Sequence, residues 1–473
     1  MNSSIRSVAS LLIMMVAGIG CSKQFNDAGS SQLENVPVSY DTSGKVMAGV
    51  PTNSSVTLNL LFPYATECSV SYGISPDALM PASETISLSA GVPKEMVLRN
   101  LQAGKKYFYR LHYKEPGSST SQSSPLYSFV TQRQPGASFS FGVQGDSHPE
   151  RTGKMFSSDL YKTNMRNVSS QGVDMYFTMG DDFSLQRLIQ FNTANQLNVE
   201  GIYALQRPYL GMVASNASVF LVNGNHEEAA MYRLDGTATN PAVLAGNARK
   251  KFFPVPQPGS IYTGDANPLN FVGNLADYYA FNWGDALFVV IDPYWHTPVN
   301  GDLWDITLGK EQYDWFKATL LNSTAKFKFV FTHHVLGTGR GGIEMANLAE
   351  WGGRSPNGQW EFDKFRPGWN DPIHQIMVKA GVTVFFQAHD HLYCRQELDG
   401  IVYQSVPNPA DDTYTAFNDS AYTSGVKLPN SGFLKVQVSP QSVKVDYINA
   451  VLPANESTTN RNGMIRHSYT ITK

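Results

Sequence analysis

The stretch VTVFFQAHDHLYCR, residues 382–395, joins an apolar run to a polar cluster. Residues 382–386 are all β-branched or aromatic, which is typical of a buried strand. The run leads within a few residues to His389 and His391, which flank Asp390. A single pair of histidines does not identify a site, so the decisive question is whether other strands end in the same way.

Four other apolar runs lead directly into polar residues. They are FSFGVQ before Asp146 and His148, DMYFTM before Asp181, SVFLVN before Asn225 and His226, and FKFVFT before His333 and His334. In α/β sheets, ligands bind at the carboxyl ends of the strands. We therefore expect all five clusters to meet at one edge of the fold.

The clusters contain carboxylate, amide and imidazole groups, and five strand ends carry six of the ten histidines. These groups suit one or two metal ions of the Zn, Mn or Fe type. Thiolate is absent from the clusters, so a structural zinc site is not expected. A lone aspartate after a strand is usually a turn residue or a helix cap, and it is the recurrence that indicates a site.

Strands alternate with helical stretches from about residue 137 onward. Helices are predicted at 157–171, 309–322 and 372–380, each between apolar strands, which favours a layered α/β domain. The tail returns to strands at 432–438, 442–450 and 467–473, which we expect to close a second sheet. The α/β domain is placed at 137–450, with a C-terminal strand extension at 451–473.

Short strands punctuated by Gly, Pro, Asn and Ser fill residues 45–132 and predict an all-β sandwich. Within it, LQAGKKYFYRLHY resembles the tyrosine corner of a fibronectin type III-like domain. Tyr107 or Tyr109 is then a corner or core residue without a catalytic part.

The first 21 residues resemble a signal peptide, with Arg6, an apolar run too short to span a membrane, and Cys21. Cys21 followed by Ser-Lys resembles the lipidated cysteine of a bacterial lipoprotein, which predicts export and anchoring to the cell envelope. A periplasmic or secreted protein is the alternative. Residues 22–44 are polar and are interpreted as a linker.

The chain has 473 residues, 42% of them hydrophobic, and a formal net charge of −3. It lacks the basic balance of a nucleic-acid-binding protein, so no nucleic acid is expected beyond a nucleotide substrate. The only membrane contact expected is the lipid anchor. Three cysteines provide no disulfide framework and no CxxC pair for zinc.

The order D-x-H, GD, GNH, H and H-x-H resembles that of the calcineurin-like metallophosphoesterases, and within them the purple acid phosphatase-like branch. The likeness covers residues 45 to about 450 and implies an N-terminal β-sandwich followed by a four-layer α-β-β-α metallophosphoesterase domain. Two departures concern the metal set. Ser184 stands where the purple enzymes have a tyrosine, and His148 is a histidine that their first motif lacks. Ala388 replaces the glycine of the G-H-x-H signature.

The resemblance implies two metal ions, of Fe, Zn or Mn. One would be held by Asp146, His148, Asp181 and His391, and the other by Asp181, Asn225, His333 and His389. A hydroxide bridging the ions would attack the phosphorus atom, with His226 as the group that binds phosphate and protonates the leaving oxygen.

His334 is expected either to face substrate or to stack beneath the site. Arg340, in the glycine-rich segment GTGRGG (337–342), is a candidate phosphate ligand, with a flexible surface loop as the alternative. The leading hypothesis is an exported phosphomonoesterase that acts on a small phosphoester. The alternatives are a phosphodiesterase acting on nucleotides or phospholipid head groups, and a surface-binding lipoprotein without catalysis.

Overall fold

The computed structural model describes residues 39–81, 83–227, 231–335 and 339–473. The predicted signal peptide (1–21), the anchor Cys21 and residues 22–38 of the linker lie outside these ranges. Among the described residues, no helix has both the length and the apolar character needed to span a bilayer.

Two antiparallel sheets between residues 46 and 130 pack face to face. The first contains β1 (Val46–Gly49), β2 (Val56–Leu60) and β5 (Lys94–Leu98), and the second contains β3 (Thr66–Gly73), β4 (Ile86–Leu88), β6 (Lys106–Lys114), β7 (Gln122–Ser123) and β8 (Tyr127–Val130). Apolar side chains from both sheets, Leu58 and Val70 among them, share one core. This confirms the β-sandwich predicted for the N-terminal part of the chain.

The tyrosines of the LQAGKKYFYRLHY segment belong to the interior of the sandwich. The backbone N–H of Gln102 donates to the Tyr107 hydroxyl at 2.8 Å, and Tyr109 is fully buried. Such a bond back to a residue just upstream is typical of a tyrosine corner. The fibronectin type III-like assignment and the domain boundaries stay predictions.

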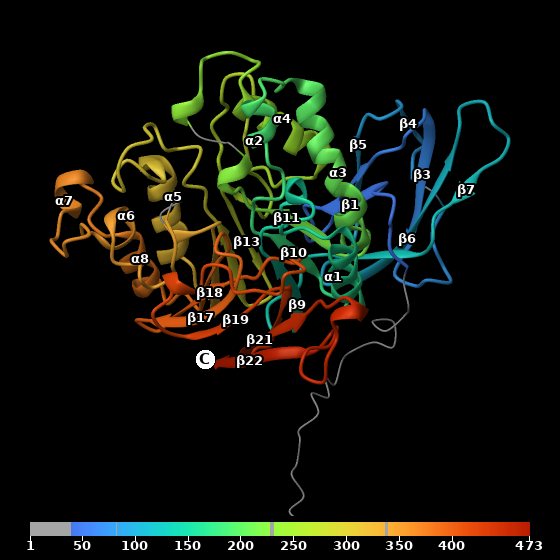
Figure 1. Ribbon diagram of the computed structural model, residues 1–473. Helices are drawn as coiled ribbons and strands as arrows, with labels where there is room; N and C mark the ends of the chain where they lie inside the picture. Colours follow the sequence, from blue (N-terminus) through green and yellow to red (C-terminus); the bar gives the residue numbers. More distant parts are fainter. Residues whose placement is uncertain (1–38, 82, 228–230, 336–338) are drawn as a thin grey trace, which may run out of the picture. The chain divides into compact units, whose positions relative to one another are not determined.

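Two larger sheets form the rest of the fold (Figure 1). The first has the order β11-β10-β9-β20-β21-β22, with β9 (Phe139–Gln144), β10 (Met175–Thr178), β11 (Ser218–Leu221), β20 (Gly432–Val438), β21 (Ser442–Asn449) and β22 (Ile465–Thr472). Strands β9, β10 and β11 run parallel, whereas β20 to β22 are antiparallel. The C-terminal strands therefore extend the sheet that β9 begins.

The second large sheet has the order β12-β13-β14-β15-β16-β18-β17-β19. Its strands are β12 (Thr263–Gly264), β13 (Tyr279–Trp283), β14 (Ala286–Val290), β15 (Phe327–Phe331), β16 (Val384–Gln387), β17 (Tyr393–Leu398), β18 (Ile401–Ser405) and β19 (Val426–Leu428). An apolar core rich in aromatic rings fills the space between the sheets, where Phe177 stacks on Phe331 at 4.4 Å between ring centroids.

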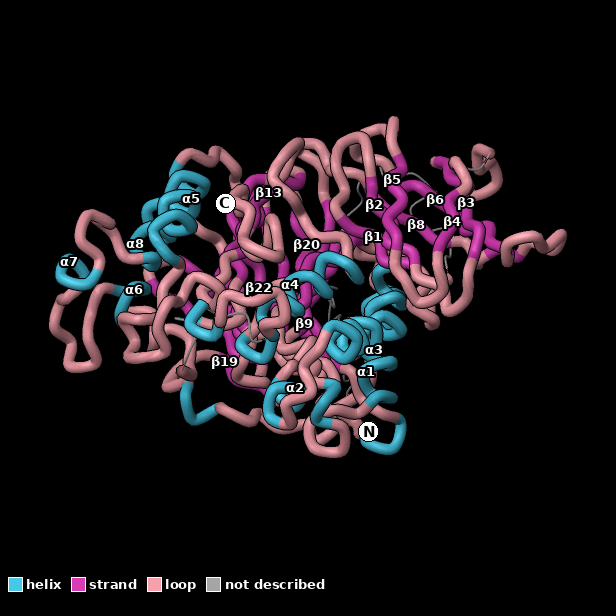
Figure 2. Tube along the Cα trace, turned by 90° about the horizontal axis from the view of Figure 1, so that it is seen from above, coloured by secondary structure: helices cyan, strands magenta, loops and turns pink. Residues whose placement is uncertain are grey.

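Helices cover the outer faces of both large sheets. Three helices share a core with the first sheet: α1 (Ser158–Ser170), α3 (Gln196–Ala214) and α4 (Pro241–Phe252). Four helices share a core with the second sheet: α5 (Gly309–Leu321), α6 (Ala349–Gly352), α7 (Phe362–Phe365) and α8 (Ile373–Ala380). In Figure 2, α1 and α3 lie on one side of the strands and α5 and α8 on the other. The layers are therefore α-β-β-α, as predicted.

The predicted helices correspond to α1, α5 and α8, each within two residues of its predicted ends. Helix α3, the longest helix described, and helix α4 were not predicted from the sequence. Helix α3 contains Gly201, Pro208 and Gly211, which are unfavourable inside helices, and its apolar face is stabilised by packing on α1, α4 and the sheet.

Candidate metal centre

The carboxyl ends of five parallel strands supply the site. In the first large sheet, β9 leads to Asp146, β10 to Asp181 and β11 to Asn225. In the second sheet, the neighbouring strands β15 and β16 lead to His333 and His389. The backbone N–H of His389 donates to Asp146 Oδ1 at 2.9 Å, so the strand ends of the two sheets meet.

Backbone conformations that are rare for non-glycine residues concentrate at these strand ends. His148, Asp181, His389 and His391 all have φ between 49° and 66°, in the left-handed region. Such conformations cost free energy and cluster at functional sites. They turn the backbone sharply after each strand, so that the side chains converge.

The close approach of two loops explains Gly180, the glycine of the GD motif after β10. A Cβ atom at Gly180 would lie 2.4 Å from the backbone nitrogen of Gly224, and Gly180 itself has a φ of 96°. Glycine is therefore needed directly before Asp181, because a side chain there would separate the β10 and β11 loops.

The predicted ligands form two overlapping groups, and the facing atoms in each lie within 4.8 Å of one another. One group contains Asp146, His148 and His391. The other contains Asp146, Asp181, His333 and His389. His389 and His391, only two residues apart, thus belong to different groups, as the two-metal hypothesis requires.

Two carboxylates stand between the imidazoles. Asp146 Oδ2 lies 3.0 Å from His391 Nε2 and 3.7 Å from His148 Nε2. Asp181 Oδ2 lies 3.1 Å from His333 Nε2 and 3.6 Å from His148 Nε2. Asp181 therefore contacts one histidine predicted for each metal ion, as a shared ligand should. Asp146 does so too, because its Oδ2 also lies 3.9 Å from His333 Nε2.

Backbone groups hold the two carboxylates in orientation. The N–H of His226 donates to Asp181 Oδ1 at 2.8 Å, just as that of His389 donates to Asp146 Oδ1. In each case the second oxygen is left to face the imidazoles. Hydrogen bonds that orient ligands in this way are typical of metal sites.

The tautomers of two histidines are fixed by similar contacts. His333 donates from Nδ1 to the Met179 carbonyl at 2.8 Å, and His148 Nδ1 lies 2.9 Å from the Glu150 carboxylate. Both rings therefore present Nε2 to the centre of the site.

The electrostatics of the site favour a bound cation. Burial alone would raise the pKa of Asp181, but His333 beside it holds that pKa well below its usual range. Burial opposes the charged form of His333 too, yet Asp181 and Asp146 raise its pKa to about 10. Two buried carboxylates therefore stabilise positive charge at this point, whether a proton or a metal ion supplies it.

Unsatisfied polar atoms provide a separate test of whether the residues fit a metal ion. The side-chain oxygen of Asn225 is buried and has no hydrogen-bond partner among the described residues. Such an atom costs free energy unless something binds it. Together with the nitrogen and oxygen donors around it, Asn225 fits a ligand of a hard or borderline cation.

His226 lies at the border of the site. Its side chain is 14% exposed, its Nε2 atom is 3.9 Å from Asp181 Oδ2, and its Nδ1 atom is 3.3 Å from the Ser184 hydroxyl. Burial lowers the pKa of His226; Asp181 opposes this shift, and the charges of His148 and Arg151 add to it. Ser184, which replaces the tyrosine of the purple enzymes, thus contacts His226.

His334 and Arg340, the two predicted substrate contacts, differ in their burial and in their neighbours. His334 is buried, stacks on His389 at 4.1 Å between ring centroids, and has Nδ1 2.8 Å from the Tyr294 hydroxyl. Arg340 is 44% exposed and donates to Asp390 Oδ1 at 2.9 Å. Their contacts with substrate stay predictions.

Sequence reasoning missed three polar residues of this region, namely Glu150, Arg151 and Glu227. Glu227 is buried, and its carboxylate accepts hydrogen bonds from four backbone N–H groups, those of residues 181, 182, 183 and 224. Glu227 directly follows the GNH motif, and Glu150 and Arg151 stand two and three residues after the GDSH motif, so proximity to a motif was the available signal.

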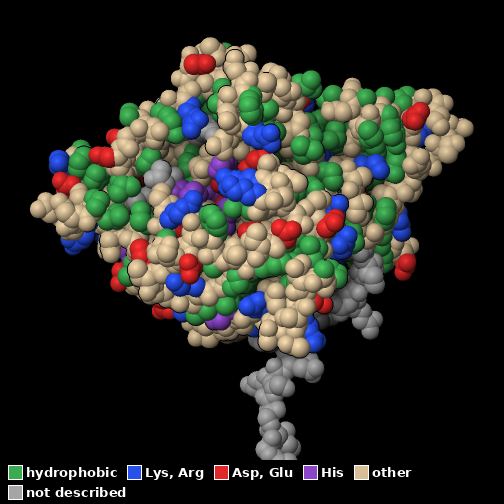
Figure 3. Space-filling view, in the orientation of Figure 1, with side chains coloured by type: hydrophobic (Ala, Val, Ile, Leu, Met, Phe, Trp, Pro, Cys, Tyr) green, Lys and Arg blue, Asp and Glu red, His purple; other side chains and the backbone are tan. Residues whose placement is uncertain are grey.

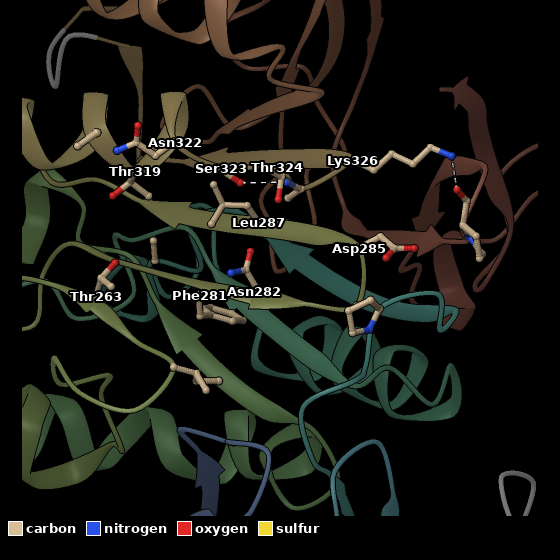
Figure 4. Close-up of a pocket in the computed structure, with 17 residues that line it drawn as sticks. Thr263, Phe281, Asn282, Asp285, Leu287, Thr319, Asn322, Ser323, Thr324 and Lys326 are labelled. Carbon is tan, nitrogen blue, oxygen red and sulfur yellow. Dashed lines mark hydrogen bonds between the residues drawn. The ribbon is translucent and has the colours of Figure 1, made fainter.

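Histidine side chains reach the surface beside Lys and Arg side chains in Figure 3. The surface groove of about 920 Å³ in Figure 4 is a different feature. Its lining comes from β13, β14, the end of α5 and neighbouring loops, and includes none of the predicted site residues.

No protein-family model matches the chain, and no curated protein sequence is significantly similar to it. A solved structure of PhoD matches with a TM-score of 0.64 and 15% identity, covering 92% of this chain and 91% of PhoD. The purple acid phosphatase PPD1 from yellow lupin (Lupinus luteus) seeds matches with a TM-score of 0.60 and 16% identity, covering 92% and 75%. The chain therefore has the purple acid phosphatase-like metallophosphoesterase fold, which confirms the fold implied by the motifs.

Proposed function

We propose that this protein is a metal-dependent phosphoesterase with a dinuclear centre. The observation that carries the proposal is the meeting of five strand ends, which brings two carboxylates and four imidazoles within a few ångströms of each other. The unsatisfied side-chain oxygen of Asn225 and the fold shared with a purple acid phosphatase support it.

Seven residues would hold the two ions, of Fe, Zn or Mn. They are Asp146, His148, Asp181 and His391 for one ion, and Asp181, Asn225, His333 and His389 for the other. When bound, such a pair supplies Lewis acidity and an activated water as nucleophile. The chain contributes the orientation of these ligands, through the backbone N–H groups of His226 and His389.

His226 would hold the proton for the leaving oxygen. Its ring is partly exposed at the border of the cluster, where it faces Asp181 and His148 with the ligand atoms of all three residues within 4.8 Å of one another. The Ser184 hydroxyl can accept from Nδ1–H, which leaves Nε2 toward the substrate side. A general acid in this position contributes about 100- to 10,000-fold to the rate.

The substrate proposed is a phosphomonoester. The test is to load the purified protein with Fe, Zn or Mn, count bound metal by mass spectrometry, and measure hydrolysis of 4-nitrophenyl phosphate and bis(4-nitrophenyl) phosphate. We expect about two ions per chain and faster monoester turnover. No turnover by the fully loaded protein would overturn the proposal, and a diester preference would favour the phosphodiesterase alternative.

We also propose that the chain is exported and anchored through a lipid on Cys21. The support is the sequence of residues 1–21 alone, which lies outside the described residues. Expression of the full chain in a bacterium supplied with labelled palmitate should label the protein, and a C21S variant should lose the label. A mature protein that carries no label would contradict the anchor.

A further inference from the structure

Arg151 lies in the turn that follows the first motif. The short helix η2 (Pro149–Arg151) begins directly after His148, and the N–H of Arg151 donates to the His148 carbonyl at 2.9 Å. This tight turn sends His148 into the ligand cluster while Arg151 Nη2 lies 3.2 Å from His226 Nε2. The arginine therefore borders the atom proposed to protonate the leaving group.

The described contacts of Arg151 leave its positive charge weakly compensated. Nη1 lies 3.0 Å from the Met155 sulfur, a weak acceptor, and Nε is 3.5 Å from Glu150 Oε1. That oxygen already pairs with His148 Nδ1 at 2.9 Å. The Arg151 side chain is 29% exposed, so a ligand entering from solvent can reach it.

The guanidinium and the imidazole stand side by side at the edge of the ligand cluster. Arg151 Nη2 lies 3.2 Å from His226 Nε2, and both side chains are partly exposed, 29% for Arg151 and 14% for His226. Arginine carries only hydrogen-bond donors, so an anion in front of this pair can accept from the guanidinium.

We propose that Arg151 binds the non-bridging oxygens of the substrate phosphoryl group, next to His226. This inference rests on the proposed phosphoesterase function. A guanidinium fork matches phosphate oxygens in geometry and charge, which makes arginine well suited to such a site. Arg340 is a different case, because its Nη1 donates to both Asp390 Oδ1 and the His389 carbonyl.

The experiment compares the metal-loaded protein with R151Q and R151K variants, and uses R187Q as the matched control. Arg187 is an exposed arginine on α2 (Gln186–Gln190), so its replacement removes one positive charge near the motif after β10. Three quantities are measured for each protein: bound metal per chain, the Kd for inorganic phosphate by calorimetry, and kcat and KM on a monoester.

We expect R151Q to keep its metal and to bind inorganic phosphate about tenfold or more weakly, as the loss of charge-assisted hydrogen bonds predicts. R151K, which keeps the charge but loses the fork, should fall between R151Q and the unaltered protein, and R187Q should match the latter. The kcat/KM value should fall in parallel with phosphate affinity.

Unchanged phosphate affinity in R151Q would overturn the inference while leaving the phosphoesterase function intact. Loss of metal in R151Q would also overturn it, because the arginine would then act through Glu150 and His148. If the unaltered loaded protein hydrolyses no ester, the proposed function itself fails, so the two failures are distinguishable.

Discussion

His389 and His391 belong to different groups of predicted ligands, although only one residue stands between them. Both have left-handed backbone conformations, and the Asp390 side chain between them accepts from Arg340, from the Gly341 N–H and from the Tyr422 hydroxyl. Asp390 thus faces away from the ligand groups. The two imidazoles can therefore serve different ions.

His226→Ala separates proton transfer from metal binding. The Asp181 carboxylate is held by the backbone N–H of residue 226, which alanine retains, so bound metal should stay near the unaltered value. Removal of the imidazole should lower kcat by about 100- to 10,000-fold. Turnover and metal content measured on the same sample check this, and loss of metal would show that His226 is a ligand.

Asp181→Asn, unlike His226→Ala, should lose its bound metal. Its Oδ2 atom contacts both His333 and His148, which belong to different predicted ions. Loss of this negative charge should remove both ions and abolish turnover, because Asp181 is the carboxylate predicted to bind both ions. Metal analysis of the purified variant provides the measurement, and full occupancy would contradict the bridging role.

The site residues could be predicted because each stands directly after a strand that its composition reveals. Asp146, Asp181, Asn225, His333 and His389 all follow apolar runs, and parallel pairing brings those ends together. The supporting residues could not be predicted in this way. Glu227 acts through backbone N–H groups of another loop, and such contacts appear only once the chain is folded.

Helices α3 and α4 could not be predicted from the sequence for a similar reason. Their local preferences are weak, since α3 contains a proline and two glycines. Their stability comes from contacts with each other, with α1 and with the first large sheet. Tertiary packing of this kind overrides intrinsic helix propensity, and a single sequence does not reveal it.

Glu227→Ala tests the support of the loop after β10. The substitution leaves four buried backbone N–H groups without their acceptor, and the free energy of unfolding should fall by about 3 kcal/mol or more. Chemical denaturation measures this change. E397A, at a side chain that is 55% exposed, is the control and should change stability by less than about 0.5 kcal/mol. Equal stability of the two variants would show that water replaces the carboxylate.

The β-sandwich and the α/β layers are joined by buried polar contacts within one compact unit, Val38–Lys473. The buried Arg207 on α3 donates to Asn59 Oδ1 at 2.7 Å, and the Tyr109 hydroxyl donates to the Ser215 carbonyl at 2.9 Å. The Tyr262 hydroxyl donates to the Pro51 carbonyl at 2.7 Å. Unfolding of either part would leave these groups unpaired, which couples the stabilities of the two parts.

Two buried thiols report on this coupling. Cys68 lies in the sandwich core and Cys394 on β17, and burial raises the pKa of each to about 12. In a C21S background the native protein should therefore not react with a thiol reagent at neutral pH. Variants with C394S or C68S each retain one described thiol, and both thiols should become reactive over the same range of denaturant. Reaction of Cys68 at a distinctly lower concentration would mean that the sandwich unfolds on its own, despite the hydrogen bonds of Arg207 and Tyr109.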